Sequence, residues 1–287
     1  VQDGRLVIVE GLGVRDPATG VAVDADTRFR IASMSKAFTV LAILKLRDEG
    51  RLSLEEPAAR YVPELRKWKP ATVDARPITV RDLLHHTAGF VEDNPWGDRQ
   101  QVLTEPEFTA LINGGMEFAN APGARNEYSN YGYALLGRII SNVSGKSYQA
   151  YIRDTIMRPL GMMSTGFDIA VGLPGTRSIG SRWADDKWVR EPDMGGVETT
   201  ANDYAKWIAF LLSAWPARDE PETGPVSRAT VRDLAALGSP MTSVERSSEI
   251  GAPCRQGVAY GGGLRIVSDC DLGRVITHTG GYPGYGS

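Results

Sequence analysis

Residues 33–49 constrain the fold of this chain more than any other segment, because they predict a helix that is apolar almost all round. Between Ser33 and Lys45 apolar side chains fill nearly every position, so almost no polar stripe faces water. A helix of this kind is buried on every side, and Gly50 marks its end. The rest of the chain must therefore supply layers that cover it.

Strands are expected at both ends of the chain and helices in its middle. An Asp-Gly turn predicts a hairpin over residues 1–9, and strands are predicted over 260–267 and 274–278. The region 53–165 predicts short helices separated by prolines. Further expected elements are a helix capped by Thr79 and Asp82, helices over 130–143 and 148–157, a hairpin around 184–186, and a helix from Thr200 through Ala214.

This order of elements predicts an α+β chain with two domains. We expect an antiparallel sheet flanked by helices, built from the two ends of the chain, residues 1–52 and 196–287. Residues 53–195 form a mostly helical domain inserted between these two parts. The buried helix over 33–49 then lies where the two domains join.

Charge and hydropathy exclude several classes of protein. The formal net charge is -3, without the basic stripe of an electrostatic nucleic-acid binder. No apolar run is long enough to cross a bilayer, so we expect no membrane span. Cys254 and Cys270 flank one predicted strand and are too few for a disulfide framework. A single bridge and two free thiols both remain open.

Ser33 and Lys36 form the only Ser-x-x-Lys sequence in the chain. Residues three apart share one face of a helix, so the hydroxyl and the amine can meet. A serine hydroxyl needs a neighbouring base to become a nucleophile, and a lysine can act as that base when its surroundings lower its pKa. The alternative interpretation is a helix-capping serine followed by a surface lysine.

Two further motifs carry polar groups suited to the same chemistry. Tyr128-Ser129-Asn130 stands before an apolar helix and offers a phenol for proton transfer and an amide for holding a carbonyl. His278-Thr279-Gly280-Gly281 ends a predicted strand, and its glycines let a substrate lie along the strand edge. The backbone N–H groups of Gly281 and Ser33 are candidates for an oxyanion hole. Taken singly, these motifs also fit a loop tyrosine with a capping Asn, and a plain strand end.

Together and in this order, the three motifs resemble those of serine β-lactamases and penicillin-binding proteins, with Tyr-Ser-Asn in place of Ser-Asp-Asn. The chain is similar to the class C β-lactamase and D,D-peptidase superfamily, whose relatives include D-aminopeptidases and esterases. Residues 29–36, 78–90 and 195–203 also look like family segments.

The resemblance implies a helical domain beside an α/β domain, with Ser33 as the acylated residue. Lys36 and Tyr128 would share the general-base work, and Tyr128 would protonate the leaving group. Asn130, His278, Thr279 and Gly280 would bind substrate, and no metal or cofactor would be needed. The family's usual location slightly favours the periplasm or secretion.

Two departures from the family pattern stand out. His278 occupies the place where most β-lactamases have lysine, and histidine is mostly neutral near pH 7. The chain also stops just past the predicted oxyanion strand and starts inside its first hairpin. We therefore expect it to be incomplete at both ends, with a companion C-terminal fragment of the same polypeptide as a partner.

The function that follows is a serine hydrolase that forms an acyl-enzyme on amide or ester bonds. We expect a small-peptide peptidase that favours D-residues, with a small peptide or ester as substrate. A β-lactamase or carboxylesterase of the same fold is the alternative, and a non-catalytic penicillin-recognising receptor or scaffold is the alternative of another class. His85 and His86 are adjacent, lack a third convergent ligand, and are expected to have structural roles rather than to bind metal.

Overall fold

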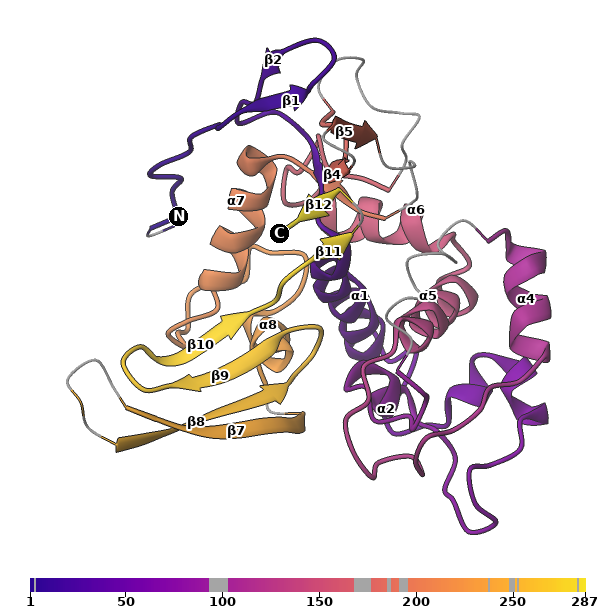
Figure 1. Ribbon diagram of the computed structural model, residues 1–287. Coiled ribbons are helices and arrows are strands. Elements are labelled where there is room, and N and C mark those ends of the chain that lie inside the picture. The colour runs from indigo at the N-terminus through magenta and orange to yellow at the C-terminus, as the bar shows by residue number, and fades with distance from the viewer. Residues whose placement is uncertain are drawn as a thin grey trace. The chain divides into compact units, whose positions relative to one another are not determined.

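The computed structural model describes residues 1–2, 4–92, 103–167, 177–184, 187–190, 196–236, 238–247, 251, 253–282 and 284–287 (Figure 1). The chain forms two compact units. The first unit comprises Val1–Ser35, Ile152–Val231 and Thr279–Ser287, and the second comprises Lys36–Tyr151 and Arg232–His278. These boundaries differ from the domains expected from the sequence, which remain a prediction.

Helix α1 (Lys36–Asp48) forms the centre of the second unit. Of its thirteen residues, only Lys45, Arg47 and Asp48 are not buried. The sequence predicted one helix from Ser33, but residues Ala32–Ser35 form a separate 3-10 turn in the first unit. Ala32 has a φ of 44°, so the chain bends sharply at the first residue of this turn. The buried character of the helix is confirmed.

Helix α5 (Asn130–Ser144) packs against α1, and α2 (Val80–Leu84) packs against α5. The cap of α2 is confirmed: Thr79 Oγ1 accepts from the Asp82 N–H, and the Asp82 carboxylate accepts from the Thr79 N–H. Helix α5 starts where predicted, because the Ser129 hydroxyl accepts the N–H of Gly132 at 3.0 Å.

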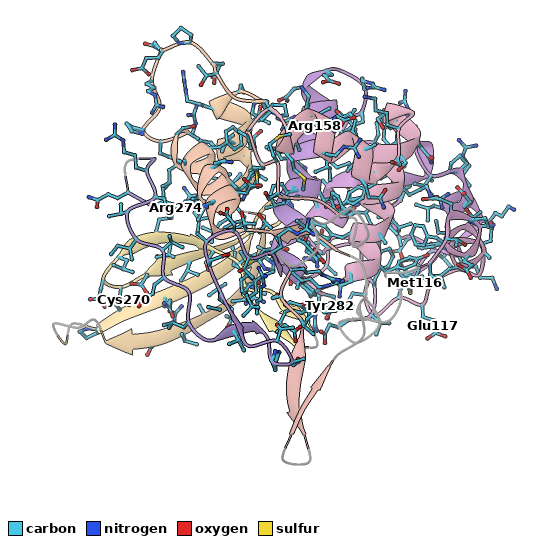
Figure 2. All side chains as sticks on the ribbon, turned by 90° about the horizontal axis from the view of Figure 1, so that it is seen from above. Met116, Glu117, Arg158, Cys270, Arg274 and Tyr282 are labelled. Carbon is cyan, nitrogen blue, oxygen red and sulfur yellow. A yellow bond between two sulfur atoms is a disulfide. The ribbon has the colours of Figure 1, made fainter. Side chains whose placement is uncertain are left out.

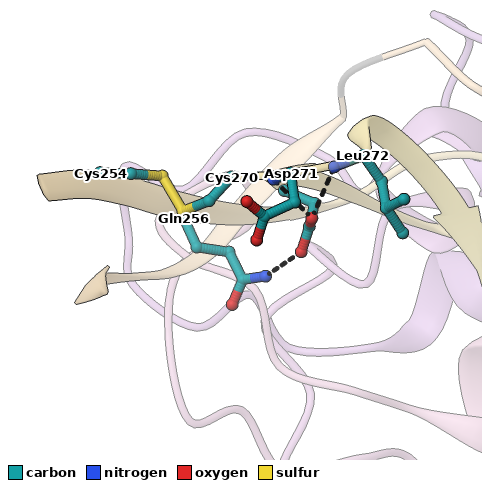
Figure 3. The surroundings of a disulfide bond; sticks show 6 residues. Cys254, Gln256, Cys270, Asp271 and Leu272 are labelled. Carbon is teal, nitrogen blue, oxygen red and sulfur yellow. Dashed lines mark hydrogen bonds between the residues drawn. A yellow bond between two sulfur atoms is a disulfide. The ribbon is translucent and has the colours of Figure 1, made fainter. Parts of the chain in front are cut away.

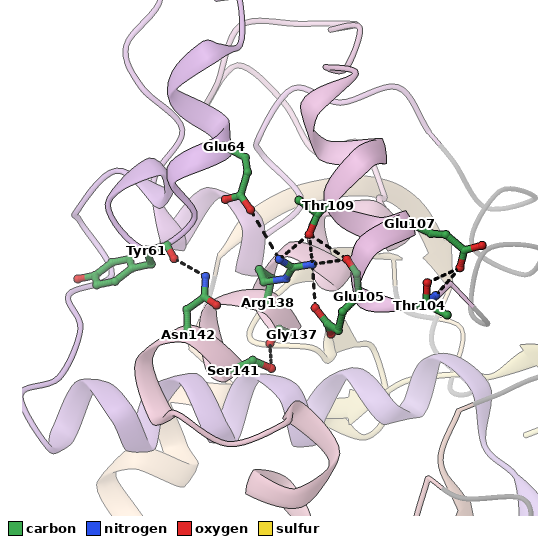
Figure 4. Close-up of polar contacts among 10 residues, drawn as sticks. All are labelled: Tyr61, Glu64, Thr104, Glu105, Glu107, Thr109, Gly137, Arg138, Ser141 and Asn142. Atoms are coloured by element: carbon green, nitrogen blue, oxygen red, sulfur yellow. Dashed lines mark hydrogen bonds and ion pairs between the residues drawn. The ribbon is translucent and has the colours of Figure 1, made fainter.

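The largely buried side chain of Arg138 links α5 to two further helical segments of the second unit. The Arg138 guanidinium lies 2.8 Å from a carboxylate oxygen of Glu105 and also donates to Thr109 Oγ1 at 3.1 Å (Figure 4). Glu105 and Thr109 belong to α4 (Glu105–Asn113). Arg138 also lies 3.6 Å from Glu64 of η3 (Pro63–Lys67), which follows η2 (Ala58–Arg60). A single side chain thus joins three helical segments.

The second unit also contains a four-stranded antiparallel sheet in the order β10-β9-β8-β7. Its strands are β7 (Ser239–Ser247), β8 (Pro253–Tyr260), β9 (Arg265–Asp269) and β10 (Gly273–Thr277). The last two were predicted: β9 as residues 260–267, which begins five residues too early, and β10 as residues 274–278, which is shifted by one residue. Arg274 of β10, labelled in Figure 2, donates to the carbonyl oxygen of Ala235, which directly follows α8 (Arg228–Leu234).

A disulfide joins Cys254 on β8 to Cys270 just after β9, with 5.9 Å between the two Cα atoms (Figure 3). The question left open by the sequence is therefore answered in favour of a bridge. Next to it, the Asp269 carboxylate accepts from Gln256 Nε2 at 2.9 Å and from the backbone N–H groups of Asp271 and Leu272. This turn is closed by covalent and polar bonds together.

A turn of three glycines, Gly261 to Gly263, connects β8 to β9 and lies against α1 and the end of α8. The Gly262 N–H donates to the Leu234 carbonyl at 2.9 Å. Gly263 has a φ of 71°, and a Cβ there would lie 2.8 Å from the carbonyl carbon of Lys36. The backbone can come this close to the start of α1 only without side chains.

The first unit contains short pairs of strands and the helix α7 (Ala201–Leu212), whose N-cap Thr200 was predicted. The pairs are β1 (Val14–Asp16) with β2 (Val21–Ala22), β3 (Phe29–Arg30) with β6 (Glu198–Thr199), β4 (Ser181–Ala184) with β5 (Lys187–Arg190), and β11 (Gly281–Tyr282) with β12 (Tyr285–Gly286). The β4–β5 pair is the expected hairpin, whose turn at 185–186 lies outside the described residues.

One expectation for this unit is corrected. The hairpin over residues 1–9 is reduced to one bridge between Gln2 and Arg5, because residues 6–9 are exposed and bury no apolar face that would hold a second strand. Further along, the Asp16 carbonyl accepts the N–H groups of Thr19 and Gly20 and closes the turn between β1 and β2. A sheet built from both ends of the chain remains a prediction.

The predicted helix over 148–157 consists of α6 (Tyr148–Ile152) followed by a π-helical turn, η4 (Arg153–Met157). Among the described residues, no helix combines the length and apolarity needed for a membrane crossing.

Candidate active site

Ser33 lies in the 3-10 turn Ala32–Ser35 of the first unit, where it is partly exposed. The turn is closed by a hydrogen bond of 3.0 Å from the Met34 N–H to the Ile31 carbonyl. Lys36 is the first residue of α1 and belongs to the second unit. Two residues of chain connect the predicted nucleophile to its predicted base.

The side chain of Lys36 is buried, with 7% of the residue's surface exposed. Its Nζ donates a hydrogen bond of 2.6 Å to Asn130 Oδ1. The same nitrogen lies 4.8 Å from the centre of the Tyr128 ring and 5.3 Å from the centre of the Tyr133 ring. The negative faces of aromatic rings attract cations at such distances. The structure therefore brings together Lys36, Tyr128 and Asn130, three residues that the sequence singled out.

The start of α5 positions the Tyr128-Ser129-Asn130 motif. Ser129 caps the helix, so Asn130 is its first residue and Tyr128 lies in the preceding extended segment. The Ser129 backbone N–H donates to Nδ1 of His86 at 3.0 Å. The tight turn into the helix thereby places the phenol and the amide on either side of a buried serine.

His278 directly follows β10, and its Nε2 lies 3.2 Å from the hydroxyl of Tyr260 at the end of β8. Its ring centre is 6.5 Å from that of Tyr128. The predicted substrate-binding histidine therefore lies in the same unit and the same aromatic cluster as Lys36, Tyr128 and Asn130.

Thr279, Gly280 and Gly281 belong to the first unit, as Ser33 does. Gly280 exchanges two backbone hydrogen bonds with Ser287, at 2.6 and 2.8 Å. A Cβ at Gly280 would lie 2.3 Å from the carbonyl oxygen of Ile31, two residues before Ser33. The glycine is required at this point, because the C-terminal strand lies directly on the backbone that leads into Ser33.

The sequence did not identify Tyr133 and Tyr260 as parts of this cluster. The Tyr133 hydroxyl donates to the Leu84 carbonyl at 2.9 Å, and Tyr260 is completely buried. Burial raises the pKa of both phenols, so both stay protonated. Tyr133 was detectable in principle, because it stands three residues after Asn130 on one face of α5. The strand pairing that brings Tyr260 to this cluster leaves no signal in the sequence.

His85 and His86 do not form a metal site in the described part of the chain, where no group of three or more His, Cys, Asp and Glu residues converges. His86 instead lies beneath Tyr128, with 4.3 Å between the ring centres. The two histidines adjacent in sequence thus have different surroundings.

Comparisons with known proteins show the family and the fold to which this chain is related. The model of the Beta-lactamase family matches residues 1–287. Protein flp of Staphylococcus aureus (strain NCTC 8325 / PS 47) is 32% identical over 232 residues, which cover 74% of this chain and 44% of the relative. The chain thus spans less than half the length of that curated relative.

Two solved structures share the fold. The octameric penicillin-binding protein homologue from Pyrococcus abyssi has a TM-score of 0.80 and 29% identity, covering 98% of this chain and 63% of that one. The D-amino acid amidase from Ochrobactrum anthropi SV3 has a TM-score of 0.70 and 23% identity, covering 95% and 75%. By its sequence over the full 287 residues, and by the fold it shares with these proteins, this chain belongs to the beta-lactamase family.

Proposed function

We propose that this chain carries the active site of a serine hydrolase that cleaves amide or ester bonds through an acyl-enzyme. The observation that carries the proposal is the hydrogen bond from Lys36 Nζ to Asn130 Oδ1, beside the ring of Tyr128. An amine, an amide and a phenol meet there at the start of the helix that follows Ser33. The amine and the phenol can act as the adjacent base that activates a serine, and the amide holds the amine in place.

In the proposed reaction, Ser33 Oγ attacks the substrate carbonyl carbon, and its proton passes to the pair formed by Lys36 and Tyr128. The N–H groups of Ser33 and Gly281 stabilise the resulting oxyanion. When the tetrahedral adduct collapses, the bond to the leaving nitrogen or oxygen breaks, and Tyr128 supplies the proton that it takes. Water then attacks the Ser33 ester and gives a proton to the same pair. The bond between the acyl carbon and Ser33 Oγ breaks, and the pair returns the proton to Oγ as the acid leaves.

The substrate class that we propose is a small peptide or amide with a D-residue at the cleaved bond. The fold likeness to the D-amino acid amidase supports this choice. So does His278, because histidine lacks the permanent charge with which lysine holds a substrate carboxylate near pH 7. Hydrolysis of β-lactams or of carboxylic esters is the second candidate, supported by the family match.

Turnover of a substrate panel distinguishes the candidates. The panel consists of D- and L-aminoacyl p-nitroanilides, p-nitrophenyl esters and nitrocefin, each measured as kcat/KM. The proposal expects the D-aminoacyl anilides to be the best substrates. If nitrocefin or the esters had the highest kcat/KM of the panel, the second candidate would be established instead. Acylation by a labelled penicillin without turnover of any member would indicate a receptor.

A further inference from the structure

His86 is bonded to the residues on both sides of Tyr128. Its Nδ1 accepts the N–H of Ser129 at 3.0 Å, and its backbone carbonyl accepts the N–H of Glu127 at 2.8 Å. Only 2% of the His86 surface is exposed. One buried residue therefore fixes the backbone before and after the phenol that the proposed reaction uses.

The His86 ring also supports the Tyr128 side chain directly. The two ring centres are 4.3 Å apart, with an angle of 36° between the planes. Two buried phenols hold the imidazole from other sides, Tyr260 at 4.4 Å and Tyr133 at 4.9 Å. Tyr128 thus rests on a ring that has little room to move.

The imidazole is neutral. Burial lowers its pKa well below the ordinary value, and the nearby charge of Lys36 lowers it further. Because Nδ1 accepts the Ser129 N–H, the ring proton belongs on Nε2. Among the described residues, this nitrogen is buried without a hydrogen-bond partner. A charged ring would place a second N–H against that of Ser129 and a second cation beside Lys36.

The backbone of His86 is strained. Its φ of 57° lies in the left-handed region, which only Gly, Asn, Asp and His visit with any frequency. A strained conformation together with a buried nitrogen that lacks a partner is a combination that a purely structural position has no reason to keep. Both features are explained if the residue serves the site next to it.

We propose that His86 is a positioning residue, which holds the phenol of Tyr128 and the turn leading to Asn130 in the geometry for proton transfer. The proposal rests on the function proposed above for Tyr128. It assigns to His86 no proton transfer of its own, because the ring stays neutral and its Nδ1 is already engaged.

Two substitutions separate the functions of the ring. His86→Phe keeps an aromatic ring but leaves the Ser129 N–H without its acceptor. His86→Asn loses the ring but offers an amide oxygen near the place of Nδ1, and asparagine accepts the left-handed backbone. His85→Asn is the matched control, because it changes the neighbouring histidine. Each variant is measured for its melting temperature and for its rate of acylation by a fluorophosphonate probe.

We expect His86→Phe to slow acylation by about 100-fold, which is the scale of one misplaced acid–base group. His86→Asn recovers acylation to within about tenfold of the original rate, and His85→Asn changes it by less than about threefold. The same effects are expected in kcat for p-nitrophenyl acetate, with KM nearly constant.

A double-mutant cycle with Tyr128→Phe gives the decisive comparison. In the Tyr128→Phe background, a second change at position 86 is expected to cost less than about threefold, because coupled residues are not additive. Equal losses in both backgrounds would overturn the proposal and show a merely structural role. If His86→Phe does not fold, the same cycle run with His86→Asn gives the answer. If Tyr128→Phe alone acylates at the original rate, it is the proposed function that fails.

Discussion

The Nζ of Lys36 and the Oδ1 of Asn130 are joined by a hydrogen bond of 2.6 Å, although 94 positions of sequence separate the two residues. Each is the first residue of its helix, α1 or α5, so the bond ties the two helix starts together. The amine is thereby held in one position next to the phenol of Tyr128.

Removing the amine tests the base. We expect Lys36→Ala to slow acylation by at least about 1,000-fold, since losses within a cooperating catalytic group are large. Lys45→Ala on the same helix is the control, because Lys45 pairs with Glu49 at 3.1 Å near the surface. Stopped-flow acylation with a fluorophosphonate measures both variants. A Lys36→Ala variant as fast as Lys45→Ala would contradict the assignment.

Ser33→Ala is expected to abolish labelling by a fluorophosphonate and by a fluorescent penicillin, because no other hydroxyl would carry the acyl group. Ser35→Ala is the matched control: it removes a hydroxyl in the same 3-10 turn and is expected to label as the unchanged protein does. Intact-mass spectrometry after incubation reads both results. Persistent labelling of Ser33→Ala would mean that the nucleophile lies elsewhere.

A fixed charge at position 278 is expected to change substrate preference. His278→Lys places an ammonium where the imidazole now meets the Tyr260 hydroxyl at 3.2 Å. We expect kcat/KM for nitrocefin, which carries a carboxylate, to rise about tenfold relative to p-nitrophenyl acetate. His278→Gln adds no charge and is expected to leave this ratio unchanged. An equal ratio in the two variants would place position 278 outside the substrate's reach.

The buried histidines make stability depend on pH. Burial, assisted by the charge of Arg81, lowers the pKa of His85 to about 4. The unfolded chain, with a pKa near 6.5, takes up this proton more readily, so the free energy of unfolding falls as the pH drops from about 6.5 to about 4. The loss amounts to roughly 3 kcal/mol. Urea unfolding across this range should show a shallower decline for His85→Gln, and identical slopes would contradict the assignment.

The disulfide is expected to contribute to stability and not to catalysis. It closes a loop between residues 16 positions apart, and such a loop is worth about 3 kcal/mol. Cys254 lies about 20 Å along β8 from Tyr260, at the strand's other end. The double variant Cys254→Ser with Cys270→Ser should therefore unfold at lower urea yet acylate within about twofold of the original rate. If the acylation rate of the double variant fell together with its stability, this prediction would be wrong.

Local signals predicted the helices well. The Thr79–Asp82 cap, Ser129 before α5 and Thr200 before α7 each depend on residues three apart, and the structure confirms all three helix starts. The same reasoning overextended the central helix, because the bend at Ala32 arises from backbone conformation and not from hydrophobic pattern. Strand β7 was missed because its residues are largely exposed and lack clear alternation; pairing with β8 supports it.

Sequence reasoning could identify candidate site residues that stand together in short motifs. It could not identify residues that only the tertiary structure brings to the site. The motifs singled out Lys36, Tyr128 and Asn130, and the structure places these three side chains together. Their catalytic roles stay a prediction. His86 was assigned only a structural role, because neighbouring histidines on a helix have no pattern that points to a tyrosine 42 positions away. Tyr260 reaches the cluster through the register of the sheet, which no short segment specifies.

The glycine turn between β8 and β9 has a consequence for how this half of the molecule opens. Its backbone rests on the backbone of Lys36 and is bonded to Leu234, so lifting the sheet away would uncover the first turn of α1. Loss of the sheet and loosening of the helix start that carries Lys36 are then expected to be one cooperative event. Amides of the sheet and of the first turn of α1 would exchange with deuterium together, and a partly frayed molecule would be an inactive one.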